Sequence, residues 1–258
     1  MLGHLGLSNS TTTSKNNNKS YVLSNSSSLH EMDDTVIACA ERDTIHLRCT
    51  ESDRITYGAS WVATYSKIMS VSIDDGALVT GDSNGLVLSW RVTIRRRRGR
   101  DPFVEDRPLC RFEAHCGSEI TALSVCRDLD VVVSMSQGSG VYMHTFSETR
   151  VLMHIPLRLG CDLHLSRSGR FAVCSEDTKL QVFGPLGRTL GHEVCDTKLS
   201  VLRMDLEGEL VIVALQNRVE IRRAFGGEKK NLEVLFEFRD LCDRGHTIRD
   251  LCLERDIL

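Results

Sequence analysis

The residues of this chain that could do chemistry are nine histidines, ten cysteines and a run of arginines. Histidines serve as acid–base groups or metal ligands, but the sequence has no His-Glu-x-x-His, no Gly-x-Ser-x-Gly and no phosphate-binding Gly-Lys-Ser/Thr loop. Carboxylates are abundant, yet no spacing brings two of them together for acid–base catalysis. The sequence therefore predicts that the chain is not an enzyme. It offers no catalytic, cofactor-binding or metal-binding residue, and its binding residues stay unassigned.

None of the ten cysteines forms a Cys-x-x-Cys pair. Most lie in apolar runs, such as Val173-Cys174-Ser175, where a free thiol behaves as a small apolar side chain. A zinc site needs paired ligand spacing, which is missing. We therefore expect reduced, buried thiols in a cytosolic protein, without metal.

Residues 95–100 (RRRRGR) form the one strong charge run. Asp101, Glu105 and Asp106 follow closely and partly neutralise it. The pattern favours a solvated loop and leaves electrostatic attraction to a membrane or a partner as the alternative. With a net charge of −3 for the whole chain, we do not expect nucleic acid as a partner.

The beginning of the chain differs in composition from the rest. From Ser8 to Ser28, sixteen of twenty-one residues are Ser, Thr or Asn. The stretch therefore has too few apolar residues to offset the entropy of ordering the chain. We expect residues 1–35 to be a disordered tail. The first seven residues lack a basic region, and no apolar run approaches the roughly 18 residues of a membrane span. No signal peptide or transmembrane segment is predicted.

From residue 36 onward the sequence repeats a β-hairpin. A short run rich in β-branched and aliphatic residues is followed by a turn of Asp, Asn, Gly, Ser or Gln and then a second such run. The five predicted hairpins pair residues 36–40 with 44–48, 77–81 with 86–90, 131–134 with 141–144, 171–174 with 179–183, and 210–214 with 219–222.

A further β-rich run precedes four of these hairpins, and a last copy occupies residues 248–253. The copies start at residues 68, 120, 162, 199 and 248. The distance from one start to the next is near the roughly 40–45 residues of a four-stranded propeller blade. The longest interval contains a basic insertion, residues 93–108. No interval holds a convincing amphipathic helix, which favours radially repeated antiparallel sheets over a helical solenoid. The predicted fold is an all-β, WD-repeat β-propeller over residues 36–258.

WD repeats carry Gly-His before the first strand and Trp-Asp at the end of the third, and these groups form a buried hydrogen-bonded chain. The signature here is incomplete. Trp90 is at the third-strand position, and His115 and His192 are expected at blade entries, but His144 and Arg222 replace the Trp in their blades. We therefore expect apolar packing to hold each blade more than the polar chain does.

The segment 108–146, with Ala114-His115, the strand run 120–125 and the closing Val141-Tyr142-Met143-His144-Thr145, resembles the C-terminal WD-repeat propeller of BEACH-domain proteins of the neurobeachin class. In that family a His-Thr at the end of the third strand is usual. The resemblance implies a large cytoplasmic scaffold in vesicle traffic, lysosome-related organelles or autophagy, peripheral on endomembranes through the parent protein. The propeller would bind other proteins through its rim loops.

About five blades are recognisable, whereas the family closes with seven, so we expect an incomplete seven-bladed propeller that is part of a longer protein. Two other functions stay open from the sequence. One is an unrelated WD-repeat adaptor in ubiquitin ligation or RNA processing. The other is a propeller hydrolase, which the Val, Ala, Leu and Ser content of the inner runs disfavours.

Overall fold

The computed structural model describes residues 20–24, 35–51, 54–62, 64, 66–93, 103–104, 107–115, 117–157, 160–205, 207–215, 218–225, 232–239, 241 and 248, for much of the first sheet as backbone alone. Every regular element in this part of the chain is a β-strand, which confirms the predicted all-β class. The arginine run and the copy that follows Ile248 lie outside the described residues.

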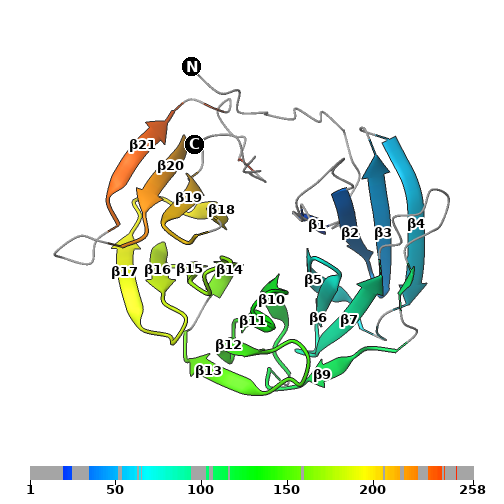
Figure 1. The fold of residues 1–258 in the computed structure, drawn as a ribbon. Coiled ribbons are helices and arrows are strands. Elements are labelled where there is room, and N and C mark those ends of the chain that lie inside the picture. Colours follow the sequence, from blue (N-terminus) through cyan, green and yellow to red (C-terminus); the bar gives the residue numbers. More distant parts are fainter. Residues whose placement is uncertain are drawn as a thin grey trace.

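The described strands form five antiparallel sheets, which we call blades 1 to 5, arranged around a common centre (Figure 1). Blade 1 contains β1 (Ser20–Ser24), β2 (Thr35–Glu41), β3 (Thr44–Glu51) and β4 (Arg54–Val62). Blade 2 contains β5 (Ile68–Asp74), β6 (Ala77–Asp82), β7 (Val87–Thr93), β8 (Phe103–Val104) and β9 (Cys110–Phe112).

The other three blades have four strands each. Blade 3 contains β10 (Ile120–Cys126), β11 (Val131–Ser136), β12 (Gly140–Thr145) and β13 (Val151–Ile155). Blade 4 contains β14 (Gly160–Leu165), β15 (Phe171–Ser175), β16 (Lys179–Phe183) and β17 (Thr189–Val194). Blade 5 contains β18 (Leu199–Met204), β19 (Leu210–Leu215), β20 (Arg218–Arg223) and β21 (Val234–Phe238). The first strand of each blade lies nearest the centre (Figure 1).

All five predicted hairpins and all four preceding runs are strands with antiparallel pairing. The turns follow from residue chemistry. Gly85, between β6 and β7, has a φ of +84°, and a Cβ there would lie 2.1 Å from the carbonyl oxygen of His115, so only glycine fits. The outer strands of the blades were not predicted, because their apolar pattern is weak.

Two strands lie in ranges that were expected to lack them. β1 falls within the predicted tail, residues 1–35, and pairs with β2. Its central residues, Tyr21-Val22-Leu23, are the one apolar run in the Ser/Asn-rich tract, and they complete a sheet whose other strands come from later in the chain. β8 falls within the predicted basic insertion and pairs with β7 beside β9, so the insertion divides the outer strand of blade 2.

Neighbouring blades stack through residues of compensating size. A Cβ added to Gly81 of blade 2 would lie 2.5 Å from Ile120 Cγ2 of blade 3, and a Cβ added to Gly160 of blade 4 would lie 2.2 Å from Met135 Sδ of blade 3. Cys174 of blade 4 and Leu199 of blade 5 share a buried cluster, and Ala214 of blade 5 shares another with Ile248, which follows blade 5 in the chain. A large residue on one blade therefore faces a smaller one on its neighbour, which keeps the packing dense.

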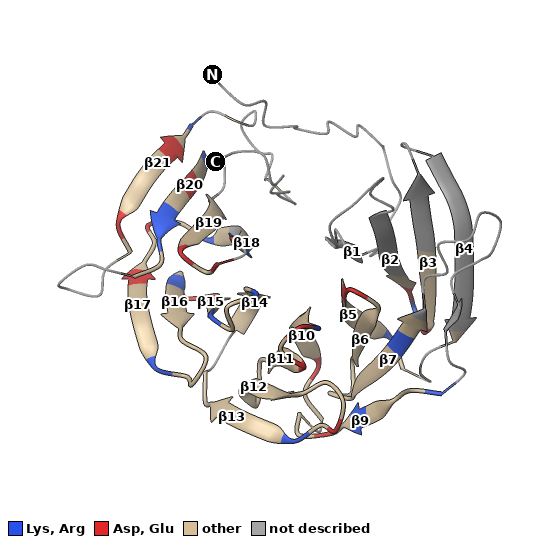
Figure 2. Cartoon of the chain, viewed as in Figure 1, with Lys and Arg blue, Asp and Glu red and all other residues tan. Residues whose placement is uncertain are grey.

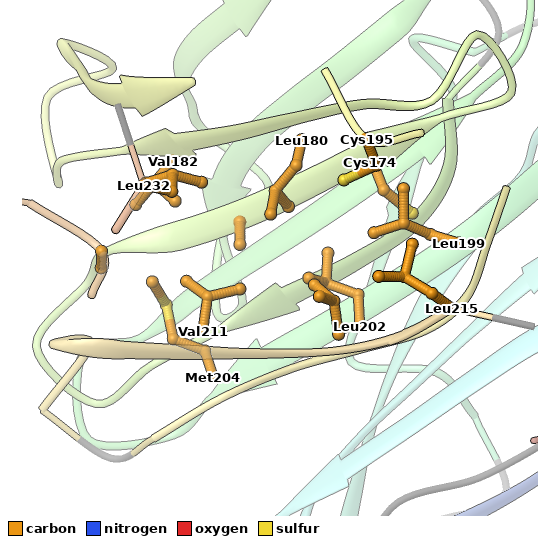
Figure 3. Packing of buried hydrophobic residues seen from close by; sticks show 13 residues of the cluster. Cys174, Leu180, Val182, Cys195, Leu199, Leu202, Met204, Val211, Leu215 and Leu232 are labelled. Carbon is orange, nitrogen blue, oxygen red and sulfur yellow. The ribbon is translucent and has the colours of Figure 1, made fainter. Parts of the chain in front are cut away.

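The core is a series of apolar layers between blades. Figure 3 shows the layer between blades 4 and 5, with Cys174 on one side and Leu202 and Val211 on the other. Successive side chains of a strand point to opposite faces, so second strands that are buried on both faces, such as β11 and β15, consist of apolar residues and serine, with cysteine in β15.

Candidate functional site

The strand pairing defines one equivalent position on the third strand of four blades. This residue pairs with the second strand of its blade, three places before Gly81, Met135, Cys174 or Ala214. The four residues are Trp90, opposite Leu78; His144, opposite Val132; Phe183, opposite Phe171; and Arg222, opposite Val211. Their exposed fractions are 2%, 0%, 4% and 6%, so each blade buries a chemically different side chain at the same place.

Blade 2 has the tryptophan. The indole Nε1 of Trp90 donates a hydrogen bond of 3.2 Å to Thr80 Oγ1 on the neighbouring strand. The Asp82 carboxylate accepts backbone N–H bonds of 2.9 Å from Asn84 and Leu86, which fixes the turn to β7. Trp90 is therefore structural, as expected, and the buried indole N–H is satisfied.

Blade 3 has a histidine at its entry. His115 is fully buried, with Nε2 2.8 Å from Ser134 Oγ and Nδ1 3.1 Å from Ser136 Oγ and 2.5 Å from Ser139 Oγ. Burial lowers the pKa of His115 to about 4, and the nearby His144 and His154 lower it further. The buried hydrogen-bonded chain of this blade therefore consists of a neutral imidazole and three serine hydroxyls, which accept from or donate to the ring nitrogens. The sequence pattern did not predict these hydrogen bonds, because the serines lie 19 to 24 residues beyond the histidine.

His144 takes the tryptophan position of blade 3. Its ring stacks on Phe112 with centroids 4.0 Å apart and planes 22° apart, and its Nδ1 lies 3.2 Å from the carbonyl oxygen of Thr145. Nε2 is buried and has no hydrogen-bond partner within the described residues. Burial lowers the pKa of His144 to about 4, against the opposing effect of the Thr145 carbonyl, so the ring is neutral near pH 7.

Blade 5 buries an ion pair at this position. Arg222 donates from Nε at 2.8 Å and from Nη2 at 2.6 Å to Glu220 Oε2, and Arg218 Nε donates at 2.8 Å to Glu220 Oε1. Arg218 also reaches Asp196, which lowers the pKa of that carboxyl. Figure 2 shows charged residues of both signs on β20. The sequence signal was the spacing of Glu220 and Arg222, which places both side chains on one face of a strand.

The remaining candidates from the sequence are structural or exposed. His192 was predicted at a blade entry, which is wrong: it lies on outer strand β17, paired with Gln181, and is exposed. His115 precedes its strand by five residues, whereas His192 precedes Leu199 by seven, and the chain in between continues β17. Trp61 lies in β4, the outer strand of blade 1.

The described thiols differ in burial. Cys126, Cys174 and Cys195 are buried, and Cys110 and Cys161 are half-buried, all as free thiols. Among the described residues, no group of three His, Cys, Asp or Glu side chains could hold a metal ion. Over the same residues, no helix is long and apolar enough to cross a membrane.

Comparison with solved structures identifies the fold class of these stacked sheets. A structure of Hsv2 from Kluyveromyces lactis with its complete loop 6CD superposes with a TM-score of 0.56 at 11% identity, covering 79% of this chain and 71% of that one. A crystal structure of the mitotic checkpoint complex gives a TM-score of 0.59 at 10% identity, covering 80% and 63%. Both are WD-repeat propellers, and the chain has the same fold.

Within that class, the sequence is similar to BEACH domain-containing protein B of Arabidopsis thaliana, at 25% identity over 198 residues. The match covers 67% of this chain and 8% of that protein's length. No family model matches the chain. The predicted resemblance to the propeller of BEACH-domain proteins is thereby confirmed.

Proposed function

We propose that the chain is a non-catalytic protein-interaction scaffold of the BEACH type, acting in vesicle trafficking, lysosome-related organelles or autophagy. The similarity to a BEACH domain-containing protein and the propeller fold support this role. In this proposal residues 36–258 act as one propeller unit, with β1 completing blade 1 and β8 joining the insertion 93–108 to blade 2. The protein is cytoplasmic and reaches endomembranes peripherally, through the longer protein of which the propeller is part.

One observation supports binding through the rim loops. Hydrogen bonds link the turns between the second and third strands of blades 2, 3 and 4, in part through the loop that precedes β10. The Gly117 N–H donates to the Asn84 carbonyl at 3.1 Å, and the Gly138 N–H donates to Ser118 Oγ at 2.9 Å. Gln137 Nε2 lies 3.5 Å from Glu176 Oε1 of the next blade. We call these residues, Asn84, Ser118, Gln137 and Glu176, the joined rim.

The joined rim presents polar groups on a rigid base. Asn84, Gln137 and Glu176 are exposed, while the strands that carry them, β6, β11 and β15, are completely buried. A binding site on loops that are held by buried strands loses little entropy when a partner docks. The exposed groups offer amide donors and carboxylate acceptors, which suit a polar protein surface.

The test compares the two rims. Gln137→Arg combined with Glu176→Arg alters the joined rim, and Asp128→Arg combined with Glu207→Arg alters exposed turns at the opposite ends of the strands. Partners captured with the unaltered protein are purified and remixed with each variant by size-exclusion chromatography. Loss of the complex in the first variant alone supports the proposal, and equal binding by both variants contradicts the use of this rim.

The BEACH assignment has its own test, because an unrelated WD-repeat adaptor would share the fold. An antibody against blades 3 to 5 isolates the cellular polypeptide, whose peptides are then sequenced. We expect BEACH-homologous peptides in the same polypeptide and co-fractionation with endomembranes. A polypeptide that lacks any BEACH-homologous segment would refute the trafficking role but leave the scaffold role intact.

A further inference from the structure

A repeated irregularity in the inner strands leads to a pair of facing thiols. In four blades the pairing of the first strand with the second slips by one residue near its start, as a β-bulge. In blade 4, Gly160 pairs with Ser175 and Asp162 pairs with Cys174, so Cys161 is the extra residue. The extra residues of the other blades are Met69, Thr121 and Ser200.

The bulge turns the extra side chain back over the neighbouring strand. Thr121 Oγ1 donates to the carbonyl oxygen of Met135 at 3.3 Å, and Cys161 Sγ lies in the same way 3.4 Å from the carbonyl oxygen of Cys174. The two sulfur atoms, Cys161 Sγ and Cys174 Sγ, are then 3.3 Å apart. Blade 4 is the one blade among these four with thiols at both positions, since the others pair Met with Gly, Thr with Met, and Ser with Ala.

The two thiols differ in access and acidity. Cys161 is half-buried, whereas Cys174 is 1% exposed. The hydrogen bond from the Cys174 thiol lowers the pKa of Cys161 despite its partial burial, with Lys198 adding to the effect and Asp162 and Glu176 opposing it. The same hydrogen bond and burial raise the pKa of Cys174. The accessible thiol is therefore the one that ionises, which is the usual arrangement of an attacking and a resolving cysteine.

We propose that Cys161 and Cys174 form a reversible, peroxide-driven disulfide. The Cys161 thiolate attacks one oxygen of hydrogen peroxide, the O–O bond breaks, and the departing hydroxide takes a proton to leave as water. Cys161 is then a sulfenic acid. The Cys174 sulfur attacks the Cys161 sulfur, the S–O bond breaks, and the released hydroxyl takes the Cys174 proton. Two thiols are oxidised to one disulfide while one peroxide is reduced to two waters.

The bond would act on the contact between blades 4 and 5. A disulfide has sulfurs about 2.05 Å apart, so the two sulfur atoms must approach each other from their present 3.3 Å. Cys174 belongs to the apolar layer that contains Leu199 of blade 5, and Cys161 packs against the same layer (Figure 3). Oxidation therefore rearranges side chains in this layer, which couples the redox state of blade 4 to its packing against blade 5.

The test uses the full chain. The reduced protein is treated with hydrogen peroxide, its remaining thiols are alkylated, and it is digested with trypsin without reduction. Cleavage after Arg158, Arg167, Arg170 and Lys179 releases Cys161 in peptide 159–167 and Cys174 in peptide 171–179. We expect loss of both separately alkylated peptides and the appearance of the 159–167 to 171–179 cross-link, which a later reducing step removes.

Matched variants separate the steps. Cys161→Ser should abolish the cross-link and leave Cys174 alkylated, and the fold tolerates serine there, since Ser200 holds the same bulge position in blade 5. Cys174→Ser should leave Cys161 as a sulfenic acid that dimedone traps. Cys126→Ser, which removes another buried thiol, should cross-link as the unaltered protein does. If peptides 159–167 and 171–179 stay separately alkylated, or if either cysteine pairs with a different one, the proposal is wrong.

Discussion

Blades 3 and 5 carry opposite chemistry at the same position of their third strands. Blade 3 buries His144, a neutral ring stacked on Phe112, and blade 5 buries Arg222, a cation balanced by Glu220. Within the described part of the chain the ring leaves one nitrogen without a partner, whereas the ion pair is hydrogen-bonded but had to lose the hydration of two charges. The blade geometry thus requires a buried side chain at this position but does not prescribe its polarity.

The two solutions differ in what disturbs them. A buried ion pair is stable only while both partners are present, because one charge left alone inside the protein is costly. A buried neutral histidine depends instead on pH, because protonation would place a charge at a buried, poorly hydrated site. Blade 2, with Trp90 bonded to Thr80, depends on neither, and it serves as the reference for both.

The largest effect is expected in blade 5. Glu220→Ala should lower the free energy of unfolding by about 3–5 kcal/mol, because Arg222 is left buried without the carboxylate oxygen that accepts two of its hydrogen bonds. Urea denaturation followed by circular dichroism measures this. Glu193→Ala is the control: its carboxylate lies 3.8 Å from the same guanidinium but is partly exposed, so a loss below about 1 kcal/mol is expected. Equal losses of stability in the two variants would mean that the buried ion pair stabilises the protein no more than the partly exposed one.

The next effect is the pH dependence of blade 3. The pKa values of His115 and His144 are about 4 in the folded protein, below the roughly 6.5 of an unfolded chain. The unfolded state therefore binds more protons between these values, so stability is complete above about pH 6.5 and falls as the pH drops toward 4. Each histidine should cost about 2 kcal/mol between pH 7 and pH 5.

The variant His144→Phe isolates one of these two groups. Phenylalanine already occupies the equivalent position in blade 4, as Phe183, so the ring should be accommodated. The loss of stability between about pH 7 and pH 5 should shrink by roughly a third in urea denaturation, because burial also lowers the pKa of His164 in blade 4, to about 3, and that group titrates in the same window. An unchanged pH slope in the variant would show that His144 is not protonated on unfolding, and blade 3 would then differ from blade 5 in polarity alone.

A smaller effect tests how the blades stack. Gly81→Ala should destabilise the protein by about 1–2 kcal/mol, because the new Cβ would overlap Ile120 of the next blade. Ile120→Ala in the same chain removes Cγ1 and Cγ2 from the contact, so the double variant should lose less stability than the two single variants together. Thermal unfolding of the single and double variants measures both. Such non-additivity would show that stacking depends on paired sizes rather than on the chemistry buried inside each blade.

The smallest effect is expected in the reference blade. Thr80→Val removes the acceptor of the Trp90 indole and should cost about 1 kcal/mol, independent of pH. In a Trp90→Phe background the same substitution should cost little more, since the indole donor is already absent. A full loss in that background would indicate that Thr80 stabilises blade 2 through another contact, as a double-mutant cycle in urea would reveal.

The sequence predicted the inner part of each blade well. Short aliphatic runs separated by Asp, Asn and Gly turns identified all the hairpins, because alternation and turn chemistry are local properties. The outer strands escaped prediction because they are short and half-exposed, and β13 and β21 have no clear apolar alternation. β1 escaped because its three apolar residues lie within a polar tract and gain a partner only from β2.

The sequence by itself therefore determined the order of strands, the meandering sheets and the apolar layers, since each depends on residues close together in the chain. Only the tertiary structure decided which polar groups meet. His115 meets Ser134 across 19 residues, and Cys161 meets Cys174 through a bulge. These partners depend on strand register and on the stacking of blades, which an individual segment does not encode, because a shift of one residue would turn every side chain to the opposite face.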